Sequence, residues 1–214
     1  MNIGIFGTGQ VAKQLAGAWR QRGHAVMIGG RSAQREETRQ WADAHDIRYG
    51  TFEETASFGQ TLVNCTAGMH SLDALAQTNE DDMRDKVLLD VSNPLDFSRG
   101  FPPTLGIVND DSLGERIQTR WPQLHVVKVL STVANTVMVD PSIVPGPHTL
   151  LMCGDDDEAK STVSRWLADD FGWRDILDLG DITQARGMEA YLLLWVRLYG
   201  AIGHDRFNIH ISRA

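Results

Sequence analysis

The sequence predicts an α/β fold with a doubly wound, mostly parallel sheet and a C-terminal strand–helix extension. Three observations indicate this class. A short apolar strand runs directly into a G-x-G-x-x-A turn, which is typical of Rossmann-type sheets. Apolar strand-like runs then alternate with helix-period segments, and 214 residues are enough for one sizeable domain. We expect one domain over 1–214, divided into a core at 1–135 and an extension at 136–214 that completes the sheet.

The first turn has the composition of a phosphate-binding loop. It follows an apolar strand over residues 3–6 and opens a helix in which Leu15, Ala18 and Trp19 share one face. Its glycines permit a tight turn and let the backbone approach a pyrophosphate, while the helix N-terminus favours negative charge. We therefore expect a dinucleotide to bind here. The residues of the turn are Gly7, Thr8, Gly9, Gln10, Val11 and Ala12.

The end of the second strand, over residues 25–28, favours NADP(H) over NAD. NAD sites usually carry an acid at this strand end to hold the ribose hydroxyls, but here no carboxylate occurs before Glu36. Instead the strand leads into Gly30 and Arg31, and Arg31 can stack on adenine or pair with a 2′-phosphate. Ser32 and Arg35 can add donors.

The later elements follow the same alternation. Right-handed crossovers between such elements imply parallel strands. Ser112 is a plausible cap for its helix, and either Asp155 or Asp156 for another. A short edge strand is possible at 207–211. The other predicted strands cover 47–49, 61–65, 86–91, 126–130, 149–154 and 175–180, and the helices cover 35–45, 52–56, 70–77, 112–120, 157–171 and 182–199.

Composition excludes several classes of function. The net charge of −8 argues against nucleic acid as a partner. Cys65 and Cys153 lie far apart in apolar runs, so we expect buried free thiols and no metal site. Because residue 3 already belongs to a strand and no apolar run nears the roughly 18 residues of a membrane span, we expect a cytoplasmic protein without a membrane partner.

Several segments together resemble the coenzyme F420-dependent NADP oxidoreductase family, whose members pass a hydride between NADPH and a deazaflavin. The resemblance runs essentially from end to end. The same domain also resembles the cytoplasmic half of membrane ferric reductases, so FMN or FAD is a possible second redox substrate. The segments are the glycine turn, Gly23-His24, Gly30-Arg31, residues 90–94, 127–133 and 153–160, and Leu179-Gly180-Asp181-Ile182.

The resemblance implies a role for each matching position. Thr8 to Val11 would meet the pyrophosphate, and Gly30, Arg31 and Arg35 the 2′-phosphate. Thr66, Ala67 and Gly68 match the segment that lines the nicotinamide ribose, although relatives have Ile-Pro or a close variant at Ala67-Gly68, and His70 falls near a family histidine. Asn93, Pro94 and the loop from Ser131 to Asn135 would shape the acceptor pocket, and Ser131 replaces the Asn of many bacterial relatives.

Hydride transfer between two planar rings needs position and dryness more than catalytic side chains. No catalytic residue stands out. A reductase of a small organic substrate would need a proton donor, for which His70, Thr132, Asn135 and Lys128 are candidates. Their structural alternatives are a helix cap or a local hydrogen bond for His70, a turn residue for Asn135, and a side chain facing solvent or a carboxylate for Lys128. A non-catalytic NADP-binding redox sensor is a third possibility.

The oligomeric state is open at this level. The helix predicted over 182–199 is too apolar for a surface helix, so it either covers the sheet or lies at a subunit interface. A homodimer and a monomer are both compatible with the pattern.

Overall fold

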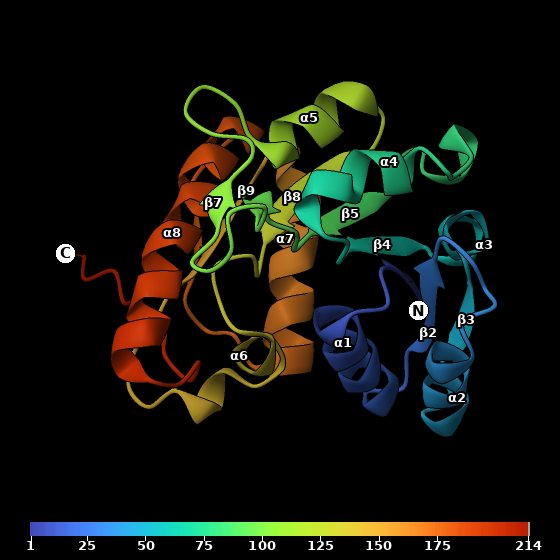
Figure 1. Cartoon of the computed structure of the whole chain (residues 1–214), viewed down its shortest axis with the longest axis horizontal. Coiled ribbons are helices and arrows are strands. Elements are labelled where there is room, and N and C mark those ends of the chain that lie inside the picture. The colour runs from blue at the N-terminus through green and yellow to red at the C-terminus, as the bar shows by residue number, and fades with distance from the viewer. Residues whose placement is uncertain (214) are drawn as a thin grey trace.

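The computed structural model describes residues 1–213, built around one eight-stranded sheet (Figure 1). Its strand order is β10-β9-β8-β5-β4-β1-β2-β3. The bounds are β1 (Asn2–Phe6), β2 (Ala25–Gly30), β3 (Arg48–Thr51), β4 (Thr61–Asn64), β5 (Val87–Asp90), β8 (His125–Val129), β9 (Leu150–Gly154) and β10 (Ile176–Asp178). A separate hairpin consists of β6 (Leu95–Asp96) and β7 (Thr104–Leu105).

Helices cover both faces of the sheet and bury an apolar core on each. One core lies under α1 (Gln10–Gln21), α6 (Asn135–Val139) and α7 (Asp157–Trp166), with Ala42 of α2 (Glu36–Ala44) at its edge. The other lies under α3, α4, α5 and α8. Their bounds are α3 (Phe52–Phe58), α4 (Ser71–Leu75), α5 (Leu113–Arg120) and α8 (Ala185–Ile202). This arrangement confirms the predicted α/β class.

The order in which strands are added to the sheet reverses at β1, which lies between β2 and β4. From β1 the order runs to β2 and β3 on one side and to β4, β5 and β8 on the other, with every one of these pairs parallel. Such a switch point leaves a crevice at the carboxyl ends of the strands, where ligands of this fold bind.

The continuation of the sheet differs from the expected parallel run in one strand. β9 pairs with β8 antiparallel, and β10 then pairs with β9 in parallel. After β8 the chain stays at the carboxyl edge through α6 and the turns over 140–149, so it re-enters the sheet from that edge. Without a helix crossing back over the sheet, the next strand must run the opposite way.

Several local expectations are confirmed and others are corrected. Ser112 and Asp156 cap their helices by accepting from Glu115 N and Ala159 N. The segment predicted as a strand over 207–211 is irregular, and only one backbone bond, from Thr149 N to Ile209 O at 2.8 Å, joins it to the start of β9. The alternating pattern at 207–211 is therefore not paired with the sheet as a strand.

The two cysteines lie in different surroundings. Cys153 is buried, and that burial raises the pKa of its thiol to about 12. Cys65 is a free thiol too, at the wall of a cavity; the residue is half-buried, and burial raises the pKa of its thiol. No helix within residues 1–213 combines the length and the apolar character that a membrane crossing requires.

Candidate functional site

A cavity of about 670 Å³ lies at the switch point, where β1, β2 and β4 end. Its walls come from the glycine turn after β1, the loop after β2 and the segment from the end of β4 into α4. The residues that line it are Gly7, Thr8, Gly9, Gly30, Arg31, Ser32, Arg35, Phe52, Cys65, Thr66, Ala67, His70, Asp73, Ala74 and Gln77. The structure therefore brings together predicted residues from three separate parts of the chain.

Glycine is needed at positions 7 and 9 of the turn for different structural reasons. Gly7 has a φ of +124°, and a Cβ there would lie 2.7 Å from the Cys65 carbonyl oxygen, so the fold itself requires glycine. Gly9 has an ordinary φ of −81°. A Cβ on Gly9 would meet nothing within 4 Å. The missing side chain therefore leaves open space in front of α1 that the protein does not fill.

The N-terminus of α1 borders that open space without any neutralising group. Its N-cap residue Gly9 offers no side-chain hydrogen bond, and the first turn of this 12-residue helix contains no acid. Unpaired N–H groups and the helix dipole make such an end favourable for an anion. The open space at Gly9 and this helix end fit a pyrophosphate, so the protein's geometry is compatible with the expected dinucleotide.

Two arginines of the loop after β2 line the cavity. Arg31 and Arg35 are exposed, and within the described chain neither guanidinium has an ion-pair partner. Two bonds hold their loop: Tyr49 donates its hydroxyl to Ser32 O, and Arg39 donates to Ala33 O. The loop is thus anchored while its two cations stay free to meet a phosphate.

The segment after β4 supplies the third wall. Thr66 donates from its backbone N (3.2 Å) and its hydroxyl (2.7 Å) to Asn64 Oδ1. His70 lines the cavity with an exposed side chain; it is the N-cap residue of α4, as one expectation had it, but its side chain makes no capping hydrogen bond. Asp73 and Gln77, three and seven residues after His70, also line the cavity; their helical spacing was a sequence signal that went unused.

Gly68, Asn93 and Pro94 lie against one another and, contrary to expectation, do not line the cavity. Asn93 donates from Nδ2 to the Ser131 carbonyl oxygen at 2.8 Å, so the ends of β5 and β8 are joined. Thr132 is 1% exposed, and Asn135 begins α6 instead of occupying a turn. Neither of these two lines the cavity.

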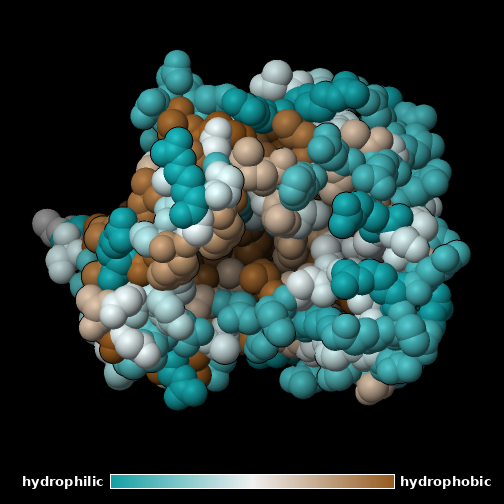
Figure 2. Space-filling model, viewed as in Figure 1, coloured by the Kyte–Doolittle hydropathy of each residue, from teal (hydrophilic) through white to brown (hydrophobic). Residues whose placement is uncertain are grey.

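A hollow with apolar residues at its base opens in the middle of the same face of the molecule (Figure 2). In Figure 1 this place lies between α8 and β7 on one side and α1 on the other. The apolar residues Val133, Ala134 and Val137, which follow β8, are each less than 9% exposed. These three residues belong to the apolar core that lies under α1, α6 and α7.

Lys128, the fourth candidate proton donor, points to carboxylates and not to solvent. Its ammonium donates to Asp90 Oδ2 at 2.9 Å, to Glu189 Oε1 at 2.8 Å and to Ser92 O at 2.6 Å. Burial alone would lower the pKa of Lys128, but the charges and hydrogen bonds of the two carboxylates outweigh it and raise that pKa. A fully buried lysine whose ammonium is already bonded to three protein oxygens is not placed to donate a proton to substrate.

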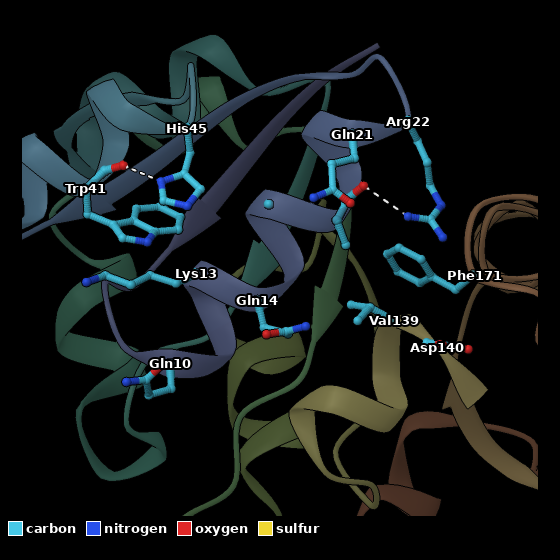
Figure 3. A pocket seen from close by; sticks show the side chains of 12 residues that line it. Gln10, Lys13, Gln14, Gln21, Arg22, Trp41, His45, Val139, Asp140 and Phe171 are labelled. Carbon is cyan, nitrogen blue, oxygen red and sulfur yellow. Dashed lines mark hydrogen bonds between the residues drawn. The ribbon is translucent and has the colours of Figure 1, made fainter. Parts of the chain in front are cut away.

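A second cavity, of about 610 Å³, lies along the outer side of α1 and away from the strand ends (Figure 3). Gln10 and Lys13 belong to it, while Trp41 and His45 of the α2 region stack at 4.4 Å on one side. On the other side stand Val139, Asp140 and Phe171. Of the glycine turn it includes only Gln10, and it includes neither Arg31 nor Arg35, so we place the candidate site at the first cavity.

Comparisons with known proteins agree with this geometry. Residues 2–94 match the model of a family described as NADP oxidoreductase, coenzyme F420-dependent. The crystal structure of a candidate F420-dependent NADP reductase from Arthrobacter sp. FB24 has a TM-score of 0.94, 41% sequence identity and 100% coverage of both chains.

Two curated proteins are more distant relatives. Rat metalloreductase STEAP3 is 29% identical over 189 residues, which cover 88% of this chain and 36% of the rat protein. The F420-dependent NADP reductase of Methanocaldococcus jannaschii is 26% identical over 147 residues, covering 68% of this chain and 65% of that protein. The chain therefore matches only part of either relative's length.

Proposed function

Because the chain belongs to the coenzyme F420-dependent NADP oxidoreductase family, we propose that it transfers a hydride between NADPH and a planar acceptor ring, a deazaflavin or a flavin. Membership of this family makes the chain an NADP-dependent oxidoreductase. The acceptor and the roles of individual residues are our inference from the site.

One observation carries the cofactor half of the proposal: the open space at Gly9 faces an uncapped helix end, with Arg31 and Arg35 on the far side. In this arrangement the pyrophosphate lies over Gly9 and the start of α1. The 2′-phosphate meets the two arginines, which no neighbouring carboxylate neutralises. An acid at this strand end would repel that phosphate, so its replacement by Arg31 supports NADP(H).

The proposal of a planar acceptor ring rests on the small number of catalytic groups that this reaction needs from the protein. When bound, the nicotinamide supplies the hydride, and the chain's own work is to orient two rings and keep water out. The apolar hollow seen in Figure 2 offers a surface that suits a planar ring, and the candidate proton donors Lys128 and Thr132 are buried. The ring acceptor needs no proton donor at all, whereas reduction of a small ketone or imine does. His70, which lines the cavity, is the candidate donor for that second function.

The test is anaerobic oxidation of NADPH by the purified protein, with the deazaflavin F420, FMN and FAD offered separately. NADPH affinity is measured in parallel. We expect turnover with at least one of the three rings, and the ring that reacts identifies the acceptor class. Tight NADPH binding with no turnover of any ring would contradict the proposal and favour a small organic substrate or a redox-sensing role.

A further inference from the structure

A row of polar side chains crosses the centre of the sheet at the carboxyl ends of β4, β5 and β8. Asn64, Asp90 and Lys128 are register neighbours on these three strands, and all three are 0% exposed. Glu189 of α8 completes the group with its bond to Lys128. Burying such charges gives little net stability compared with apolar packing, so a structural role alone does not explain the row.

The row determines which way the Asn64 amide faces. Asp90 accepts hydrogen bonds at both oxygens, from Lys128 at Oδ2 and from Asn64 Nδ2 (2.9 Å) and Ser92 at Oδ1, which is the pattern of an ionised carboxylate. An amide turned the other way would set its oxygen against this carboxylate. Asn64 therefore points its nitrogen at Asp90 and its oxygen at the segment after β4.

That amide oxygen in turn orients the hydroxyl of Thr66. Asn64 Oδ1 accepts from both the backbone N and the hydroxyl of Thr66, so the hydroxyl hydrogen is already used. Ser71 Oγ lies 2.7 Å from Thr66 Oγ1 and must then be the donor between them. The Thr66 oxygen keeps one lone pair, and Thr66 lines the cavity. Towards a ligand, this hydroxyl acts as an acceptor.

We propose that Asp90 and Asn64 are positioning residues that hold the Thr66 hydroxyl as a hydrogen-bond acceptor for a donor on the nicotinamide half of the dinucleotide. The donor is a hydroxyl of the second ribose or the N–H of the carboxamide. This inference rests on the proposed NADP(H) site. We call the contacts that run from Asp90 through Asn64 to Thr66 the Thr66 relay.

The first experiment measures binding by calorimetry to NADPH and to adenosine 2′,5′-bisphosphate, a fragment that lacks the nicotinamide half. Thr66→Val removes the hydroxyl at nearly constant shape, and we expect about tenfold weaker NADPH binding, the usual effect of one lost hydrogen bond. Thr66→Ser keeps the hydroxyl and should keep the affinity. Neither change should alter binding of the bisphosphate; an equal loss with both ligands would overturn the proposal.

The second experiment separates positioning from structural support. Asp90→Asn and Glu189→Gln each remove one of the two carboxylates that share Lys128, but only Asp90 contacts Asn64. We expect Asp90→Asn to weaken NADPH binding about tenfold and Glu189→Gln to leave it unchanged, even where both lower the melting temperature. Equal losses of affinity in the two variants would mean that the row only supports the fold.

A double-mutant cycle tests whether Asp90 acts through Thr66. If it does, Asp90→Asn adds no further loss of NADPH affinity in the Thr66→Val background, whereas additive losses contradict the Thr66 relay. Asn64→Leu, which leaves the Lys128 ion pairs in place, is the second variant should Asp90→Asn fail to fold, and the same non-additivity with Thr66→Val is expected.

One further ligand completes the design. With 2′-phospho-ADP-ribose, which has the second ribose but no nicotinamide, a retained Thr66→Val effect assigns the ribose hydroxyl and a lost effect assigns the carboxamide. If the wild-type protein binds neither NADPH nor the bisphosphate, the proposed function fails first. If it binds both and the variants change nothing, only the Thr66 relay is wrong.

Discussion

Gly68 lies directly against the backbone of Asn93, so that a Cβ built on Gly68 would fall 2.1 Å from the Asn93 carbonyl oxygen. The contact joins the segment after β4 to the segment after β5, next in sequence to the cavity-lining residues Thr66 and Ala67. It gives a physical reason for glycine at position 68 of this chain. Here the small residue lets the two strand ends approach, and Gly68 shapes the site by packing.

Two glycine-to-alanine substitutions should therefore change stability in opposite directions. Gly68→Ala forces a methyl group into the Asn93 backbone and should lower the free energy of unfolding by about 1–3 kcal/mol. Gly17→Ala lies within α1, where a Cβ meets nothing within 4 Å, and should raise it by about 0.5–1 kcal/mol. Urea denaturation of both variants checks the pair, and equal destabilisation would contradict the packing argument.

Gly9→Val should separate folding from binding. The backbone of Gly9 is extended and its Cβ position is empty, so the variant should keep the melting temperature of the wild type. It should bind neither NADPH nor NADH, because the new side chain occupies the space in which the pyrophosphate approaches the backbone. Gly7→Val is the contrast, since its φ of +124° and the Cys65 contact predict loss of the fold. Retained NADPH affinity in Gly9→Val would show that the turn binds no phosphate.

Arg31→Ala should change cofactor preference. Loss of a charge-assisted bond to the 2′-phosphate predicts about ten- to hundredfold weaker NADPH binding, with NADH within about twofold of the wild type. Arg48→Ala removes the same charge from the start of β3, outside the cavity, and should leave both affinities unchanged. Titration of each nucleotide by intrinsic fluorescence measures them, and an equal loss for NADPH and NADH in Arg31→Ala would contradict the assignment.

The sequence predicted most of the fold because its strongest signals are local. Parallel strands buried on both faces read as short apolar runs, so the strands expected at 25–28 and 61–65 lie within two residues of β2 and β4. The glycine turn and the acid-free loop after β2 are likewise local patterns, and their residues do converge on one cavity. The helix caps at Ser112 and Asp156 follow from side chains adjacent to their helices.

The features that the sequence did not predict depend on partners far along the chain. Lys128 sits in an apolar run like any strand residue, and its pairing with Glu189, 61 residues later, becomes visible only when α8 is placed. The antiparallel direction of β9 depends on how α6 returns the chain, and hydrophobic periodicity carries no information on that. The row that orients Thr66 was missed for the same reason, since it joins three strands.

The exposed side of α8 is where we propose that two copies of the chain meet. Buried residues such as Met188 and Leu192 face the protein, but Leu193, Leu194 and Ile202 are 41%, 54% and 43% exposed. A dimer would cover this apolar surface. Leu194→Glu should then convert a dimer to a monomer in analytical ultracentrifugation, while Gln21→Glu, which adds the same charge on α1, should not. A wild-type protein that sediments as a monomer at micromolar concentration contradicts the proposal.

The contact of Glu115 with Arg186 should make the docking of α8 sensitive to acid. Arg186 donates to both oxygens of the Glu115 carboxylate, at 2.8 and 2.5 Å, and so joins α8 to α5. The hydrogen bond from Arg186 is the main reason why the pKa of Glu115 lies below its ordinary value of 4.5. A carboxyl whose pKa is lowered by folding stabilises the protein above its unfolded pKa and loses that contribution as the pH falls through the folded value.

Glu115→Gln should accordingly be less stable than the wild type at pH 7, and the difference should shrink as the pH falls below 4.5. Arg186→Gln should show the same pH dependence, and the double variant should be no less stable than either single variant, because both remove one interaction. Urea unfolding at a series of pH values measures all three. A difference between Glu115→Gln and wild type that stays constant down to about pH 3 would mean that the pair carries no titrating stability.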